Sequence, residues 1–97
     1  MTELIIFGRF HARTGSEQAV AAAIRTVVAA TRSEPECLGI DAFRSLRDAS
    51  LFFIHSRWPD EAAFDRHAQL AHTRDFLASV EALLTHALDV TRTTRLD

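Results

Sequence analysis

The sequence contains no lysine, asparagine or tyrosine, and all 11 of its basic residues are arginine. These absences exclude a lysine Schiff base, a tyrosine general acid and an asparagine oxyanion donor from any mechanism. The single cysteine, Cys37, has no partner for an intrachain disulfide and belongs to no metal-binding spacing, which indicates a reducing compartment. Three glycines and two prolines are scattered singly, so the chain has no linker and no repeat.

Length and charge narrow the class of protein. The 97 residues, 47 % of them hydrophobic, are sufficient for one compact domain over residues 1–97. The net charge of −2 does not fit the strongly basic surface of a nucleic-acid-binding protein. No segment approaches the roughly 18 consecutive apolar residues of a membrane span, and the apolar run at residues 1–7 is too short for a signal peptide. We therefore expect a soluble cytoplasmic protein without nucleic-acid or membrane partners.

Hydrophobic periodicity predicts an α+β domain. Alternating or continuous apolar runs predict strands over residues 3–12, 38–46, 51–58 and 87–95. A helix is predicted between the first two strands and another between the last two. This order is typical of the ferredoxin-like βαββαβ fold, in which both helices cover one face of a four-stranded antiparallel sheet.

Capping and breaking residues set the predicted limits of the helices. Thr14 and Glu17 form a capping box that begins a helix over about residues 15–32, and Pro35 ends it. The second helical region follows Pro59 and is expected to break near Ala71. The inner face of its first piece should carry Phe64, His67 and Leu70, and that of its second piece Phe76, Leu77, Val80, Leu83 and Leu84.

The first and third predicted strands carry bulky apolar residues on both faces. Helices on one side of the sheet would leave two or three such residues per strand in water, each forgoing roughly 1.5 to 3 kcal/mol of burial. A second copy of the chain would cover them, so the sequence predicts a homodimer. Phe53 lies at this interface if the odd-numbered residues of its strand face away from the helices.

Aromatic and histidine residues cluster after the third strand. With Trp58 leaving the sheet and His67 projecting from the following helix, an indole and an imidazole can face one cavity. This arrangement pairs a flat apolar wall with a proton acceptor. The alternative is that Trp58 and Phe64 belong to the core and that His67 is hydrogen-bonded to a loop.

His67 and His72 are the residues considered for a metal site. They are five residues apart, about 140° around an ideal helix, so they share a metal only if the helix breaks between them. The third ligand considered is Asp65 or Asp75. We expect neither a metal nor a cofactor.

With these residues in place, the sequence resembles the antibiotic biosynthesis monooxygenase domain of the dimeric α+β barrel superfamily. The resemblance covers nearly the whole chain and rests on these segments: Arg9-Phe10-His11-Ala12 running into Gly15, Thr31-Arg32-Ser33-Glu34-Pro35, Cys37-Leu38, Phe43-Arg44-Ser45, Arg57-Trp58, Ala62-Ala63-Phe64, His67, and His72 before Phe76. It implies a homodimer whose two sheets form a barrel, with one pocket per subunit between sheet and helices. Relatives of this kind oxidise polycyclic phenols, anthrones or quinols with dioxygen, without a metal or flavin.

The sequence departs from the usual pattern of this family at several positions. Ser56 stands where the family often has a glutamate, Ile40 stands in the region of a frequent tyrosine, and Glu36 replaces a common glycine. The haem-degrading branch of the superfamily needs an asparagine on the first strand; this chain has Gly8 near that place and no asparagine.

Two functions follow as hypotheses. The first is a cofactor-independent monooxygenase acting on a small aromatic, with His67 as general base and Trp58 as the second catalytic residue. His72, Phe64 and Phe76 would bind the substrate. The second is a non-catalytic dimer that binds a small hydrophobic molecule or serves as a stress-response accessory, which the missing glutamate and tyrosine favour.

Overall fold

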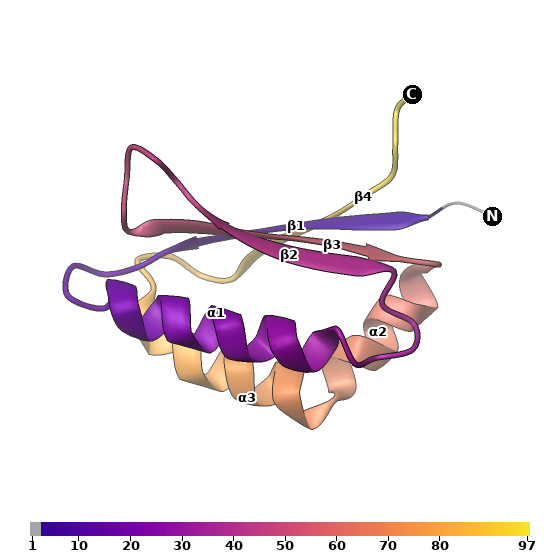
Figure 1. Cartoon of the computed structure of the whole chain (residues 1–97), viewed down its shortest axis with the longest axis horizontal. Coiled ribbons are helices and arrows are strands. Elements are labelled where there is room, and N and C mark those ends of the chain that lie inside the picture. The colour runs from indigo at the N-terminus through magenta and orange to yellow at the C-terminus, as the bar shows by residue number, and fades with distance from the viewer. Residues whose placement is uncertain (1–2) are drawn as a thin grey trace.

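A computed structural model describes residues 3–97 as a four-stranded antiparallel sheet with its helices on one face (Figure 1). The strands are β1 (Leu4–His11), β2 (Gly39–Arg44), β3 (Leu51–Trp58) and β4 (Asp89–Thr93), in the order β2-β3-β1-β4. The helices are α1 (Glu17–Thr31), α2 (Glu61–Gln69) and α3 (Ala71–Val80), followed by a short 3₁₀ turn, η1 (Glu81–Leu83). The ferredoxin-like arrangement predicted from the sequence is confirmed, although β2 and β4 are shorter than expected.

Two local predictions are wrong. The first helix begins at Glu17 with Ser16 as N-cap, because Gly15, with a φ of 92°, turns the chain and leaves Thr14 outside the helix. The capping box is absent, and Glu17 Oε1 instead accepts a hydrogen bond from the Gly15 N–H at 2.8 Å. Leu70 is not on an inner face: it is the extended residue that separates α2 from α3, and it is 39 % exposed.

Strand alternation divides the sheet residues into two sets. Even-numbered residues of β1 and β3 face the helices and build the core, whose largest fully buried side chains include Trp58 and Phe10. Odd-numbered residues face away. Among the odd-numbered residues of the whole sheet, Phe7, Phe43 and Phe53 are 53 %, 54 % and 38 % exposed in the single chain. We call this second surface the helix-free face. No helix within residues 3–97 has the length and apolar character needed to cross a membrane.

Leu84 provides a test of the core between sheet and helices. It is 3 % exposed and forms an isolated bridge with Ala12, whereas Leu46, in the turn between β2 and β3, is fully exposed. We expect Leu84→Ala to lower the free energy of unfolding by about 2 to 5 kcal/mol, because it leaves a cavity. Leu46→Ala, the matched control, should change it by less than about 0.5 kcal/mol. Urea denaturation at equal protein concentration measures both, and equal losses would contradict this description of the core.

Candidate functional site

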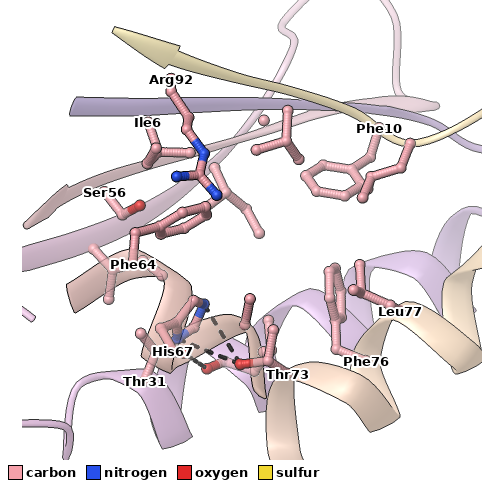
Figure 2. Close-up of a pocket in the computed structure, with 17 residues that line it drawn as sticks. Ile6, Phe10, Thr31, Ser56, Phe64, His67, Thr73, Phe76, Leu77 and Arg92 are labelled. Carbon is pink, nitrogen blue, oxygen red and sulfur yellow. Dashed lines mark hydrogen bonds between the residues drawn. The ribbon is translucent and has the colours of Figure 1, made fainter. Parts of the chain in front are cut away.

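A cavity of about 300 Å³ lies between the sheet and the helices (Figure 2). Most of its wall is apolar, and the lining residues come from all four strands and from α1, α2 and α3. The polar residues that line it are Thr31, Ser56, His67, Thr73 and Arg92. A partly open apolar cavity of this size with a few polar groups is typical of a site for a small organic molecule.

The structure brings three of the five predicted site residues to this cavity. His67, Phe64 and Phe76 line it, with Phe64 and His67 on one side and Phe76 on the other (Figure 2). Trp58 and His72 are not among the lining residues. Their contacts nevertheless connect both of them to His67.

Trp58 lies behind the cavity wall and is fully buried. Its Nε1–H donates a hydrogen bond to Ser56 Oγ at 3.0 Å, and its ring packs against His67 with centroids 4.6 Å apart. The two residues of this hydrogen bond are two positions apart on β3 and therefore share the inner face. Because Ser56 accepts from the indole, its own hydroxyl hydrogen is free to donate into the cavity. The indole thus positions Ser56 and His67 without reaching the cavity itself.

Glu34, two residues beyond the C-cap of α1, joins the two histidines. Its Oε2 lies 2.8 Å from His67 Nδ1 and 2.6 Å from His72 Nε2, and its side chain is only 10 % exposed. The two histidines belong to different helices, α2 and α3, and the break at Leu70 turns both rings toward one carboxylate. The helix break expected near Ala71 is therefore confirmed, and it lets both histidines contact the same carboxylate.

The shared carboxylate fixes the tautomer of His67. An ionised carboxylate only accepts hydrogen bonds, so the neutral imidazole donates through Nδ1–H. Nε2 is then the unprotonated nitrogen and the one left for the cavity. The Thr73 hydroxyl lies beside the ring, 3.3 Å from Nδ1 and 3.5 Å from Nε2. A histidine held in this way can accept a proton from a molecule bound in the cavity.

Ion pairs and hydrogen bonds hold the loop that carries Glu34. Arg66 on α2 pairs with Glu36, and its guanidinium lowers the pKa of that carboxyl. Arg32 donates to the Ile40 carbonyl oxygen at 3.0 Å, which ties the end of α1 to β2. Burial raises the pKa of the nearby Cys37 thiol, so this group stays protonated at neutral pH and packs as a small apolar residue.

Arg92 of β4 closes the cavity on the side of Phe64 (Figure 2). Its guanidinium carbon lies 5.0 Å from the centre of the Phe64 ring, a cation–π distance. It donates hydrogen bonds to Asp65 at 2.7 Å and to Glu61 at 3.2 Å, and the contact with Asp65 raises the pKa of Arg92. Arg92 thus connects the edge strand to α2 and forms a polar edge of an otherwise apolar wall.

The sequence-based reasoning missed Glu34 and Arg92 as site residues. For Glu34, the signal was a carboxylate just before Pro35, at the predicted end of a helix, together with two histidines across a helix break. For Arg92, it was the alternation of β4, because Val90 and Arg92 pair with the inward-facing Gly8 and Ile6 of β1. Neither signal identifies the side chains, distant in the sequence, that Glu34 and Arg92 contact.

Comparison with known proteins gives consistent matches. The sequence model of the antibiotic biosynthesis monooxygenase family matches residues 4–79. YcnE, a candidate monooxygenase of Bacillus subtilis (strain 168), is 33 % identical over 69 residues, which are 71 % of this chain and 73 % of YcnE. The crystal structure of PA3566 from Pseudomonas aeruginosa has a TM-score of 0.92 and 31 % identity, covering 100 % of this chain and 97 % of that one. Rv0793 from Mycobacterium tuberculosis has a TM-score of 0.92 and 26 % identity, with coverages of 99 % and 97 %.

The tautomer of His67 can be measured directly. Long-range ¹H–¹⁵N correlation spectra at neutral pH should show His67 with its proton on Nδ1, the minor form of a free imidazole, because Glu34 accepts from that nitrogen. Glu34→Ala should remove this preference. His55, whose ring packs on Phe7 at the helix-free face, provides an internal control whose signals should not change. An Nε2-protonated His67 in the wild type would contradict the assignment.

Proposed function

Because the chain belongs to the antibiotic biosynthesis monooxygenase family, we propose that it oxidises a small aromatic quinol or polyphenol with dioxygen, without a metal or flavin. A monooxygenase-type function is what the family and the name of its relative YcnE support. The finer proposal rests on the contact between His67 Nδ1 and the Glu34 carboxylate, which leaves Nε2 as the proton acceptor at the wall of an apolar cavity. Such a cavity suits both an aromatic ring and dioxygen.

The proposed reaction begins with proton transfer. His67 Nε2 takes the phenolic proton, and the resulting imidazolium is stabilised by the Glu34 carboxylate beside Nδ1. The phenolate passes one electron to dioxygen far more readily than the phenol does, giving a phenoxyl radical and superoxide. These two combine at a ring carbon that carries hydrogen to form a peroxide anion, which takes the proton back from the His67 imidazolium and becomes a hydroperoxide. Loss of water from the hydroperoxide leaves one oxygen atom as a new carbonyl, so dioxygen is the only oxidant required.

The remaining site residues take supporting roles. Phe64 and Phe76 contact the ring of the substrate, and the Ser56 hydroxyl donates to one of its oxygens, where the family often has a glutamate. Trp58 and His72 act through other residues: Trp58 positions His67 and Ser56, and His72 holds the Glu34 carboxylate. We therefore assign positioning roles to these two residues instead of direct contact with the substrate.

We also propose that a second copy of the chain covers the helix-free face. The support is the set of exposed phenylalanines on that face, at positions 7, 43 and 53, together with the two-sided apolar pattern of β1 and β3. A symmetric partner brings the same set of aromatic residues and removes both from water. Such pairing matches the barrel implied by the family resemblance.

Oxygen uptake tests the proposed oxidation. Purified protein treated with a chelator is assayed aerobically with a panel of hydroquinones and anthrones. We expect uptake by the wild type and a loss of about 10²- to 10⁴-fold in His67→Ala, the range of a general base. His11→Ala, a control that removes a histidine paired with Asp48 away from the cavity, should keep the activity. Equal uptake by His67→Ala would refute the proposal, and a quinol that raises Tm without being consumed would support the binding function instead.

Measurement of mass in solution tests the dimer. Light scattering should give about twice the mass of one chain, because the exposed phenylalanines forgo roughly 1.5 to 3 kcal/mol each when they stay in water. Phe53→Asp places a charge on the helix-free face and should abolish the dimer or cause unfolding or aggregation. The control Ala22→Asp, at an exposed residue of α1 on the opposite side of the sheet, should leave the dimer intact. A compact wild-type monomer at micromolar concentration is incompatible with this assembly.

A further inference from the structure

Three potential metal ligands meet at the break between α2 and α3. The side chains of Glu34, His67 and His72 each offer one ligand atom, and these atoms all lie within 4.8 Å of one another. Both imidazole nitrogens already point at the same carboxylate oxygen. We propose that this cluster binds a divalent transition-metal ion of the Zn²⁺ type.

The distances allow such an ion without a change of fold. The nitrogen–oxygen distances of 2.8 and 2.6 Å are those of hydrogen bonds. Zinc binds imidazole nitrogen at about 2.0 to 2.1 Å and carboxylate oxygen at about 2.0 to 2.2 Å, so each ligand atom would move by no more than about 1 Å. The ion would lie among the two nitrogens and the carboxylate oxygen, and its bonds would replace the two contacts that the oxygen makes with the imidazoles.

The donor set also suits this class of ion. Two neutral imidazoles and one carboxylate are a familiar ligand set of three-ligand zinc sites, which leave a fourth position for water. His67 and Glu34 have side chains that are 9 % and 10 % exposed, whereas that of His72 is 30 % exposed. The ion therefore has an entry path on the His72 side, and two of its ligands are held by the surrounding protein. The third ligand differs from the aspartates considered from the sequence, because Asp65 bonds to Arg92.

Metal binding has a consequence for His67. A neutral imidazole that coordinates through Nδ1 carries its proton on Nε2, the nitrogen left for the cavity. Such a histidine donates a hydrogen bond but cannot accept a proton. Occupancy of the site and general-base action therefore exclude each other, and Zn²⁺ should inhibit the oxidation. This consequence rests on the proposed function, whereas the metal site itself does not.

Direct binding measurements on protein without a polyhistidine tag test the site. Titration with Zn²⁺ should show one ion per chain, and Co²⁺ should give the visible absorption of a four-coordinate complex. Glu34→Ala and His72→Ala should each weaken binding by about tenfold or more, since loss of a ligand costs at least as much as loss of a supporting contact. His11→Ala also removes a histidine next to a carboxylate, Asp48, and should bind as the wild type does.

Several results would overturn the proposal. One is the absence of stoichiometric Zn²⁺ binding by the wild type, and another is unchanged affinity in both Glu34→Ala and His72→Ala. If either variant does not fold, ¹⁵N spectra of the wild type decide: Zn²⁺ should shift His67 Nδ1 and His72 Nε2 and leave His55 unchanged. Shifts at other histidines alone would refute the site. Because these measurements need no substrate, they remain decisive even if the oxidation assay fails.

Discussion

One buried carboxylate connects the parts of this site. Glu34 lies just beyond the end of α1, and its Oε2 is within hydrogen-bonding distance of an imidazole from α2 and of another from α3. A carboxylate with its side chain 10 % exposed needs such partners, because burial of an unpaired charge is costly. The need for these partners fixes the angle between the two helices, the position of His67 at the cavity and the nitrogen that carries its proton.

The sheet imposes the second constraint. Strand alternation sends Ser56 and Trp58 to the inner face, where the indole donates to the hydroxyl and packs on His67. It sends Phe7, Phe43 and Phe53 to the opposite face, away from the helices. The same period of two therefore produces both a pocket and an uncovered aromatic surface, so the pocket and the proposed dimer interface are separated by one layer of sheet.

The two proposals, oxidation of a phenol and binding of a metal ion, compete for one ring. With its proton on Nδ1, His67 would offer an unprotonated nitrogen to a phenol in the cavity. With a metal on Nδ1, the same ring becomes a donor. Arg92 pairs with Asp65 and Glu61 and closes the wall of the cavity beside Phe64. Few other polar side chains line the cavity. Both proposals depend on Glu34, which contacts His67 from outside the cavity wall.

The sequence by itself determined the order of strands and helices, the apolar character of both faces of β1 and β3, and the inner-face positions of Phe64, His67 and Phe76 on their helices, because these depend on local periodicity. Only the tertiary structure decided which face of the sheet the helices cover and that these three side chains line one cavity. Sequence-based reasoning misplaced the start of α1 and the burial of Leu70, where a single backbone angle decides the outcome. Only the tertiary structure placed Trp58 behind the wall, His72 outside the cavity, and Glu34 and Arg92 in the site. The contacts of Glu34 and Arg92 join side chains about 30 residues apart in sequence, which periodicity cannot relate.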